Sequence, residues 1–458
     1  MTYQDALTYL YSLANYERVD PAEYSSRTLD LERMRALLAA LGNPHERYKA
    51  IHVAGTKGKG STAAMLDSCL RQLNLKVALY TSPHLTTFRE RIRVNGELIG
   101  PDEVADLAER VKTASESVPG VTTFEAATAM ALLHFARQDV DWAVVEVGLG
   151  GRLDATNVIT PQVSVITSLS LDHTRLLGNT LAEIAAEKAG IIKPNVPVVS
   201  HQQPLEAATV IERVAQDRGA PLVMLGRHWR WTAGLTTLEK QTFEVKQVAR
   251  IRSKERPFVN DLEGWYETPL LGKHQLDNAT GVIAVMDALR SNGHIDITAR
   301  AIRDGLRLTF WPGRFEIMRP DPPVIADGAH NVDSVNKLAA ALAEVFPGRR
   351  WTFIFGCYKD KDAQGMIKAL APRSTRWIMT QARNSRAMPA EQLMELAQAK
   401  NLRVVALPNV KDAIDAVAKA NEPVCITGSL AVVGEARAAW GIGGGGPVFI
   451  DVDPLVGV

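Results

Sequence analysis

Cysteine is scarce in this sequence: the 458 residues include only Cys69, Cys357 and Cys425. Their number is odd, they lie far apart, and none belongs to a CxxC pair. These features exclude a disulfide framework and give no support for a cysteine-based zinc site. A chain without disulfides is typical of a reducing compartment, so we expect a cytoplasmic protein.

Excess charge of one sign and long apolar runs are also missing. The 52 Lys and Arg residues balance 51 Asp and Glu residues, which gives a formal net charge of +1. This balance excludes bulk electrostatic binding to nucleic acid or to anionic membranes. No segment is apolar over the about 20 residues that a membrane span needs, and residues 1–20 lack the basic and apolar regions of a secretory signal. We therefore expect neither nucleic acid nor membrane as a partner.

Short apolar runs alternate with amphipathic stretches from about residue 48 to residue 200. The runs occupy 48–55, 76–83, 141–148, 162–168 and 195–200, and an amphipathic stretch follows the first of them at 61–74. Buried parallel strands have this pattern, because helices cover both faces of the sheet and leave no polar side to alternate. The first half of the chain therefore predicts an α/β domain with a mostly parallel sheet.

The pattern changes between about residues 228 and 268, where Trp, Thr, Lys, Arg and Glu replace the strand–helix alternation. We interpret this stretch as antiparallel hairpins, followed by a helix over 275–290. Pro312 and Gly313 then predict an interdomain hinge. Beyond the hinge the α/β pattern resumes, with predicted helices near 332–345 and 411–420 between further apolar runs.

A glycine-rich loop lies between the first apolar run and the amphipathic stretch that follows it. It consists of Gly55, Thr56, Lys57, Gly58, Lys59, Gly60 and Ser61. Glycines let backbone amides close around phosphate oxygens, a helix N-terminus adds a positive dipole end, and Lys59 could reach the β- and γ-phosphates. Gly60 separates this lysine from Ser61, so the spacing is not the standard one. The alternative is a glycine-rich turn with two solvated lysines.

The predicted fold class is α/β, with two domains. A single core stops growing at about 250–300 residues, and this chain is longer. We expect a P-loop ATP-binding domain with a mostly parallel sheet over residues 1–310. A smaller doubly wound, Rossmann-like domain is expected over 311–458.

Glu146 lies inside an otherwise apolar strand of the sequence DWAVVEVG. An unpaired carboxylate there would cost several kcal/mol, so the side chain needs a cation or a strong donor. A metal ion at the carboxyl edge of the sheet would supply one. The alternative is an ion pair with a nearby base such as Arg152.

Asp172 and His173 directly follow another apolar run, and Lys188 lies in a predicted amphipathic helix. Taken alone, His173 is more often a helix-start or core histidine than a metal ligand, and Lys188 more often a solvated lysine.

These motifs together resemble one family, the folylpolyglutamate synthase/dihydrofolate synthase group of the Mur ligase superfamily. The resemblance covers nearly the whole chain and rests on segments that occur in a specific order: GTKGKGS (55–61), YTSPHL with FRERIRVNG (80–96), TTFEAAT (122–128), EVGLGGRLDATN (146–157), SLDHT (170–174), EKAGIIK (187–193), GKHQLDNA (272–279), WPGRFE (311–316) and DGAHN (327–331). Any one segment could occur by chance, but the ordered set is highly specific. The GKGS loop and the SPHL segment favour the folate-type group over cell-wall ligases.

The resemblance implies ATP-driven amide bond formation between L-glutamate and the carboxylate of a pterin compound, through an acyl phosphate. It implies that Gly58, Lys59, Gly60 and Ser61 bind the triphosphate. The implied magnesium ligands are Ser82 and Glu146 for one ion, and His173 and Lys188 for a second. Glu146, His173 and Lys188 are also the implied catalytic residues. Lys188 matches a lysine that this family carboxylates with carbon dioxide; an unmodified lysine paired to Glu187 or Glu183 is the alternative. The resemblance also admits a potassium ion.

The second half of the ATP site is implied to come from Asn278, Arg314, Asp327 and His330. The forked donors of Arg314 suit a phosphate, and Asp327, at a strand end, suits the ribose hydroxyls. The site would then span both domains, with closure about Pro312 and Gly313 gating the reaction. The alternatives are a hinge salt bridge for Arg314 and a helix cap for Asp327.

The remaining substrates are assigned by the same resemblance. Glutamate is expected at Ser429 of the C-terminal domain. The residues expected around the pterin are Leu29, Asp30, Leu31, Thr122, Thr123, Phe124, Glu125 and Leu153. Phe124 could supply an apolar face and Asp30 an edge hydrogen bond, although Phe124 equally suits an apolar core.

Lys57 departs from the family loop, which usually has Asn at this position. The extra cation could strengthen nucleotide binding or point to solvent. The expected substrates are ATP, L-glutamate, and dihydropteroate or reduced folates, bound by a monomer. Two rival functions are kept: another amide ligase of the superfamily that acts on a cell-wall precursor, and a nucleotide-binding regulator without ligase chemistry.

Overall fold

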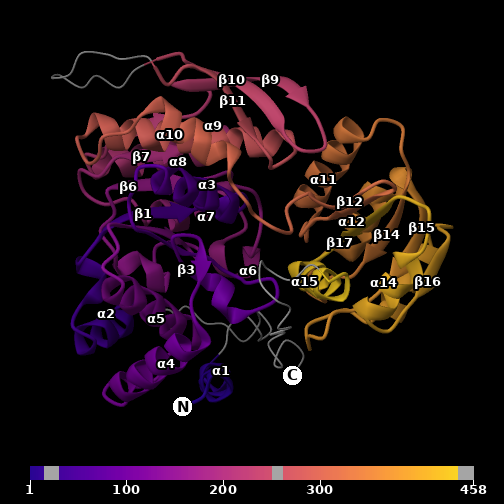
Figure 1. Cartoon of the computed structure of the whole chain (residues 1–458), viewed down its shortest axis with the longest axis horizontal. Helices are drawn as coiled ribbons and strands as arrows, with labels where there is room; N and C mark the ends of the chain where they lie inside the picture. Colours follow the sequence, from indigo (N-terminus) through magenta and orange to yellow (C-terminus); the bar gives the residue numbers. More distant parts are fainter. Residues whose placement is uncertain (15–29, 250–260, 442–458) are drawn as a thin grey trace.

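The structure is a computed structural model and describes residues 1–14, 30–249 and 261–441. The expected pterin residue Leu29 and part of the predicted hairpin region, 250–260, lie outside the described residues. Figure 1 shows two bodies side by side, one built from the first two thirds of the described chain and the other from its last third. The exact boundary at 310/311 stays a prediction.

An eight-stranded sheet forms the centre of the first body. Six neighbouring strands, from β2 to β8 in the order below, run parallel, and β3 and β4 complete one edge antiparallel. The order is β4 (Glu97–Leu98), β3 (Ile92–Val94), β2 (Val77–Tyr80), β5 (Trp142–Glu146), β1 (Lys49–Ala54), β6 (Val163–Ile166), β7 (Val198–Ser200) and β8 (Leu222–Met224). The prediction of a mostly parallel sheet is confirmed. The loops that follow its central strands therefore meet at one edge.

Helices cover both faces of this sheet, as its uniformly apolar strands predict. The helices of one face are α1 (Tyr3–Ser12), α2 (Leu31–Ala40), α4 (Pro101–Ser115) and α5 (Thr123–Arg137). Those of the other face are α3 (Lys59–Arg71), α9 (Lys273–Ser291) and α10 (Ala299–Arg307). The helices α6 (Thr174–Leu177), α7 (Leu181–Ala189) and α8 (Leu205–Asp217) belong to the β6–β8 side, and short 3-10 turns span Pro44–Glu46, Phe88–Arg91, Ala155–Val158 and Ala371–Arg373.

The predicted antiparallel segment is present as a three-stranded sheet. It comprises β9 (Trp229–Thr236), β10 (Gln241–Gln247) and β11 (Gly264–Thr268), with β10 in the middle. Its inner side chains, among them Phe243, Val245 and Tyr266, share one hydrophobic core with residues of α9 and α10. Figure 1 shows this sheet lying above those two helices. Burial alternates along β10, so one face of this sheet packs on the core and the other faces solvent.

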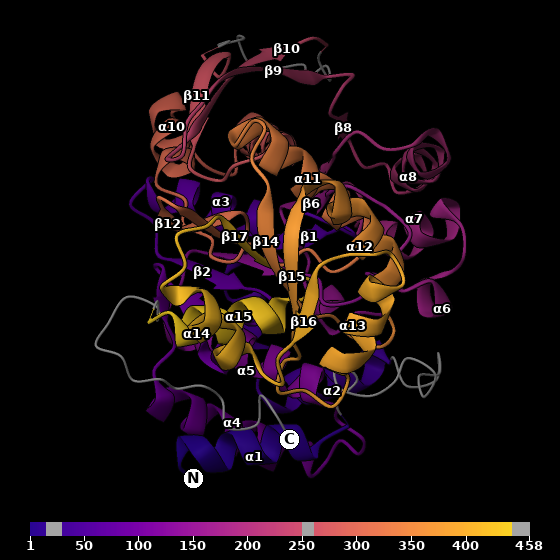
Figure 2. The ribbon, with the colours of Figure 1, turned by 90° about the vertical axis from the view of Figure 1, so that its right-hand side faces the viewer.

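A six-stranded sheet forms the second body and confirms the doubly wound prediction. Its strands are, in order, β12 (Glu316–Pro320), β13 (Pro323–Ala326), β17 (Val424–Thr427), β14 (Trp351–Phe355), β15 (Ser374–Met379) and β16 (Val404–Ala406); only β12 is antiparallel. One face carries α11 (Val332–Val345), α12 (Ala363–Leu370) and α13 (Ala390–Gln398), and the other carries α14 (Val410–Ala418) and α15 (Leu430–Ala439). Figure 2 shows the helices on both sides of these strands.

The connection between the bodies passes through Trp311, Pro312 and Gly313. Gly313 has φ +71°, a left-handed conformation that favours glycine. The ring of Trp311 packs so closely on Gly60 of the glycine-rich loop that a Cβ there would lie 3.0 Å from it. The Arg93 guanidinium lies 5.5 Å from the centre of the same ring. The first residue of the connection thus touches the loop that begins α3.

The described cysteines are all free and buried. Among residues 1–14, 30–249 and 261–441, no helix combines the length and the apolarity needed to cross a bilayer.

Candidate active site

The glycine-rich loop connects the end of β1 to the first turn of α3, as its sequence predicts. Gly58 is the N-cap of α3 with φ +89°, and a Cβ on it would lie 2.4 Å from Oδ1 of Asn278. The amides of Thr56 and Lys57 donate to the carbonyl oxygen of Ser168, each at 3.1 Å, which fixes the loop against the end of β6. The amides at the start of a 13-residue helix are therefore presented to the carboxyl edge of the sheet.

Glu146 is the last residue of β5 and is only 4% exposed. Its Oε2 accepts a hydrogen bond of 3.1 Å from the amide of Ser82, and its Oε1 lies 4.0 Å from Nζ of Lys59. Burial raises the pKa of this carboxyl, and Lys59 and the Ser82 amide oppose the shift. The carboxylate is thus only partly compensated by the protein.

The alternative partner for Glu146, Arg152, is wrong. Its guanidinium is exposed and binds Oε1 of Glu187 at 2.8 Å. Arg152 lies in the loop after β5, and its partner Glu187 belongs to α7.

Lys188, in the last turn of α7, is 4% exposed. Its Nζ lies 3.5 Å from the carbonyl oxygen of Gly150, and burial together with nearby Lys59 lowers its pKa to about 7. The alternative ion pairs of this lysine are wrong: Glu187 binds Arg152, and Glu183 accepts from the amides of residues 179 and 180 at the start of α7. Within the described part of the chain no carboxylate lies in bonding distance of this buried lysine, which makes Lys188 a candidate functional residue.

His173 follows Asp172 in the loop after β6 and has φ +49°. Its side chain is 43% exposed, and partial desolvation lowers the pKa of the imidazole to about 4. An imidazole in the neutral form can donate a lone pair to a metal ion. Asp172 is 10% exposed, and although burial acts to raise its pKa, Lys57, His173 and Lys361 keep that pKa well below its usual range. Asp172 is therefore a firm anion beside His173.

The second body contributes three of the expected residues. Arg314 donates to the carbonyl oxygen of Gly313 at 3.1 Å; burial lowers the pKa of its guanidinium, and the nearby carboxylates of Asp327 and Glu146 oppose the shift. Asp327 accepts hydrogen bonds from the amides of Phe315 at 2.8 Å and Ala329 at 2.9 Å. It shapes the loops at the end of β13 and does not cap α11. The cap is Asn331, which accepts from the amide of Ser334 at 2.9 Å.

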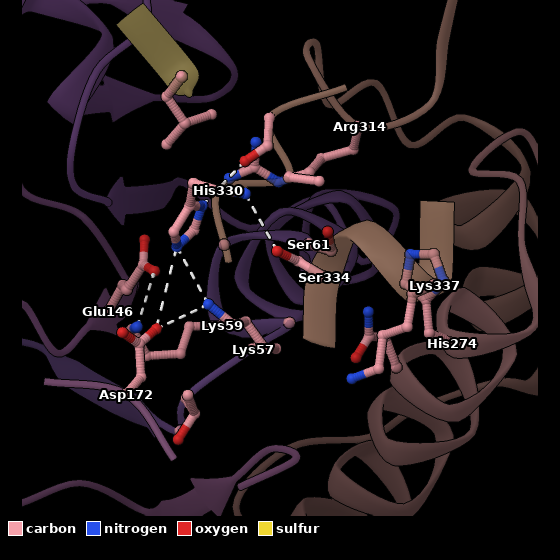
Figure 3. Close-up of a pocket in the computed structure, with 18 of the residues that line it drawn as sticks. Lys57, Lys59, Ser61, Glu146, Asp172, His274, Arg314, His330, Ser334 and Lys337 are labelled. Atoms are coloured by element: carbon pink, nitrogen blue, oxygen red, sulfur yellow. Dashed lines mark hydrogen bonds and ion pairs between the residues drawn. The ribbon is translucent and has the colours of Figure 1, made fainter. Parts of the chain in front are cut away.

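Lys57 does not point to solvent: its side chain is 13% exposed and lines the pocket, and a role in nucleotide binding stays a prediction. Its Nζ lies 2.7 Å from Oδ2 of Asp172 and 3.0 Å from Nε2 of His330. The Nδ1 of His330 bonds the carbonyl oxygen of Gly328 at 2.9 Å, so Nδ1 carries the proton and Nε2 accepts from Lys57. Figure 3 shows these three side chains meeting between the two bodies.

The expected nucleotide and metal residues line one pocket (Figure 3). Both bodies contribute to it: the first provides the glycine-rich loop, the strand ends and α7 and α9, and the second provides the loops around β13. The expected residues that line it are Gly55, Thr56, Lys57, Gly58, Lys59, Gly60, Ser61, Ser82, Glu146, His173, Lys188, Asn278, Arg314, Asp327 and His330.

Among the described residues, those expected around the pterin and glutamate do not line that pocket. Thr122 and Glu125 form the capping box of α5, and Glu125 also makes a bidentate ion pair with Arg33 of α2. Thr123 donates to the carbonyl oxygen of Leu10 at 2.8 Å. Phe124 contacts Gly148, where a Cβ would lie 2.4 Å from the ring, and Gly148 itself lines the pocket.

The other expected substrate residues have local roles in the structure. Asp30 caps α2 through the amide of Glu32 at 2.9 Å, and Leu31 and Leu153 are half-buried. Ser429 is buried and caps α15 through the amide of Val432 at 3.1 Å. Their assignment to substrates stays a prediction.

The pocket also contains residues that sequence reasoning missed. Gln275 links Asn278, from which it accepts at 2.8 Å, to Ser61, to which it donates at 3.4 Å. His274 and Lys337 line the side of the pocket formed by α9 and α11. In the GKHQLDNA segment, His274 and Gln275 come about one helical turn before Asn278, and this spacing is the sequence signal that could have identified them.

Two family models match the two bodies of the chain. The Mur ligase middle domain matches residues 53–286, and the Mur ligase glutamate ligase domain matches 313–430. The chain therefore belongs to the Mur ligases, and the enzyme is an ATP-dependent ligase.

Comparison with individual relatives identifies the family within the Mur ligases. The dihydrofolate synthase/folylpolyglutamate synthase of Bacillus subtilis is 36% identical, over 95% of this chain and 98% of its own length. The folylpolyglutamate synthase of Lacticaseibacillus casei is 34% identical, over 95% and 98%. The structure of Escherichia coli FolC in complex with DHPP and ADP has a TM-score of 0.80 at 31% identity, covering 96% of this chain and 97% of that one. The chain is a member of the dihydrofolate synthase/folylpolyglutamate synthase family.

Proposed function

We propose that the protein joins the amine of L-glutamate to a folate-type carboxylate, with ATP as the energy source and an acyl phosphate as intermediate. The observation that carries the proposal is the single pocket in which the glycine-rich loop, Glu146 and Lys188 face Arg314 and His330 of the second body. The reaction brings a triphosphate, a carboxylate and glutamate together, so mutual repulsion of anions is its main physical obstacle.

The residues of the pocket divide this work between them. Lys59 and the first amides of α3 would hold the β- and γ-phosphates, and the guanidinium of Arg314 would stabilise the phosphoryl group as it is transferred. The acceptor carboxylate attacks the γ-phosphorus and ADP leaves. The glutamate amine then attacks the acyl carbon, and phosphate leaves while the amine loses a proton. Holding the reactants in line between the two bodies supplies much of the rate enhancement.

Magnesium fits the residues at the ends of β2 and β5. Glu146 is a buried carboxylate whose nearest lysine is too far for a hydrogen bond. Ser82, whose amide binds Glu146, lines the same pocket and carries a hydroxyl. Oxygen ligands of this kind, completed by phosphate oxygens and water, are what Mg²⁺ prefers. Bound magnesium neutralises charge between ATP and the acceptor carboxylate.

A second magnesium would need Lys188 to be carboxylated. Among the described residues, no group of three or more His, Cys, Asp and Glu side chains is arranged to hold a metal ion. The neutral His173 supplies one ligand, and carboxylation of Lys188 would supply an anionic oxygen. The pKa of about 7 supports this modification, because only the neutral amine attacks carbon dioxide, releasing a proton as the carbamate forms.

The acceptor would lie beside the nucleotide pocket, at the N-terminus of α5. Phe124 packs on Gly148, which belongs to the loop that lines the pocket, so a ring bound near Phe124 could extend its carboxylate toward the phosphates. The Arg33–Glu125 ion pair fixes α2 to α5 at this place. We propose that both dihydropteroate and reduced folates are accepted, since the Bacillus subtilis relative carries both names.

The proposal is tested by phosphate release from Mg-ATP in the presence of L-glutamate, with dihydropteroate and tetrahydrofolate as acceptors in parallel. D-glutamate serves as the matched control. Release with both acceptors supports the proposal, and release with one restricts it to that activity. No release with either, together with turnover of a UDP-linked cell-wall precursor, would overturn it. Glutamate-independent ATP binding alone would indicate a non-catalytic regulator.

We further propose that a monomer carries out the reaction in the cytoplasm. The residues assigned to the nucleotide and metal sites lie together in one pocket of a single chain, which supports this proposal. A requirement for potassium is part of the same proposal and is tested by exchanging potassium for sodium in the assay.

A further inference from the structure

Asp172 contacts polar side chains of both bodies at the pocket. Within its own body, its Oδ2 forms an ion pair with Nζ of Lys57 at 2.7 Å. From the second body, Nδ2 of Asn331 donates a hydrogen bond of 3.0 Å to its Oδ2. Nζ of Lys361 forms an ion pair with its Oδ1 at 3.7 Å. One carboxylate therefore joins the glycine-rich loop, the start of α11 and the loop after β14.

The same carboxylate holds the backbone of the next residue. Its Oδ1 accepts a hydrogen bond of 3.0 Å from the amide of His173. The φ of His173 is +49°, a conformation that costs free energy in any residue with a side chain and needs support from its surroundings. The contact between the bodies thus extends to the residue expected to bind the second magnesium.

The two groups from the second body are themselves held in place. Lys361 is 13% exposed and is oriented by Oδ2 of Asp360 at 3.1 Å, while Asp360 is bound through Oδ1 by Arg386 at 2.9 Å. Asn331 uses its Oδ1 to cap α11, which leaves its Nδ2 directed at Asp172. Side chains fixed in advance lose little conformational entropy when the contact forms.

We propose that Lys361 and Asn331 are positioning residues of the ligase, which fix the second body over the phosphate loop and hold His173 in its left-handed conformation through Asp172. The inference rests on the proposed function, because it assigns the role of His173 to that reaction. Lys361 does not line the pocket, so it acts through Asp172 and has no contact with substrate. Lys57 belongs to the same contact and connects it to the loop.

The test compares Lys361→Gln with the matched control Lys359→Gln. Lys359 lies in the same loop, is exposed, and donates to the carbonyl oxygen of Ser385, away from Asp172. We expect Lys361→Gln to lower kcat about 10- to 100-fold while the Kd for ATP changes less than about threefold, because the residue is outside the pocket. Lys361→Arg, which keeps the cation, should recover most of the activity, and Lys359→Gln should match the wild type.

Hydrogen–deuterium exchange gives a readout that does not depend on activity. In the Lys361→Gln protein we expect at least about fivefold faster exchange in the segment 170–177, with no change in the segment 101–115 of the same body. If Lys361→Gln does not fold, Asp360→Asn removes the orienting partner of Lys361 and carries the same comparison.

Wild-type kcat together with unchanged exchange in 170–177 would overturn the inference. An equal loss in Lys361→Gln and Lys361→Arg would also overturn it, since the charge would then be irrelevant. If the wild-type protein releases no phosphate with glutamate while exchange in 170–177 still responds to Lys361→Gln, the proposed function fails and the contact through Asp172 stands.

Discussion

The amide of Ser82 donates a hydrogen bond of 3.1 Å to Oε2 of Glu146, which joins the loop after β2 to the last residue of β5. The bond aims the carboxylate at the pocket and leaves Oε1 turned toward Lys59. A buried acid in this setting contributes more to function than to stability, because burial raises its pKa and its charge is only partly compensated.

Replacing Glu146 with Gln should therefore separate activity from folding. We expect kcat to fall at least about 10³-fold, because a carboxylate that is assigned to metal binding is lost. The melting temperature should stay equal or rise, since a buried charge is removed. Steady-state kinetics and calorimetry check the two effects, with the exposed Glu97→Gln as control. A drop in melting temperature with retained kcat would contradict the assignment.

Lys188 should make stability depend on pH. Its pKa of about 7 in the folded protein lies below the ordinary 10.5, so between these values the unfolded chain binds the extra proton and stability rises with pH. Below about pH 7 the full cost of the buried cation is present. In buffer free of carbon dioxide, Lys188→Met should therefore be more stable than the wild type at pH 6, by on the order of a few kcal/mol. Urea unfolding at pH 6 and pH 9 measures the difference, which should shrink at the higher pH.

Carboxylation of Lys188 is checked directly by carbon-13 NMR in labelled bicarbonate. A carbamate resonance should appear, grow between pH 6 and pH 8, and be absent from Lys188→Ala. That variant should lose at least about 10²-fold in kcat, with partial rescue by short carboxylic acids. A wild-type spectrum without the resonance, and an active alanine variant, would each argue against the modification.

The Arg33–Glu125 pair should matter for both stability and acceptor binding. Its side chains are 16% and 7% exposed, so Glu125→Gln removes the charge of one partner of a largely buried ion pair, at a cost of about 3 kcal/mol. The KM for dihydropteroate should rise while the Kd for ATP stays constant. Asp415→Asn is the control. Asp415 forms an ion pair with Lys411, the two side chains are 57% and 65% exposed, and such a pair contributes under about 0.5 kcal/mol.

Glu435 gives a second dependence of stability on pH, of opposite sign. Burial raises the pKa of this carboxyl to about 7, so between pH 4.5 and pH 7 the folded state binds a proton that the unfolded state releases. Stability should therefore fall as pH rises through that window. Glu435→Gln should remove this component, on the order of 1 kcal/mol after solvent screening. If the free energy of unfolding changes with pH at the same slope in the variant and the wild type, this role of Glu435 is contradicted.

Much of this architecture could be predicted from the sequence. The apolar runs predicted the positions of the central strands, because a strand that is buried on both faces is apolar along its whole length. Glu146 was recognisable as a buried carboxylate for the same reason. The helix α10 was missed: it is only nine residues long, and its signal was Thr298, which caps it through the amide of Ala301.

The contacts of the site were harder to predict. Lys361 lies in a run of charged residues whose sequence is typical of a solvated loop, yet the fold places it against Asp172. Asp327 was expected to face a ribose, and its oxygens bind backbone amides that only the tertiary structure brings to it. Such pairings depend on how the two sheets are placed, which local patterns do not encode.

The packing of Trp311 on Gly60 gives the enzyme an internal optical reporter. An indole held between the interdomain connection and the start of α3 changes its surroundings whenever one body rotates against the other. Its emission, obtained as the difference between wild-type and Trp311→Phe spectra, can follow opening and closing in real time without an attached dye. The wild-type protein has eight tryptophans in all, and this subtraction isolates the one at the pivot.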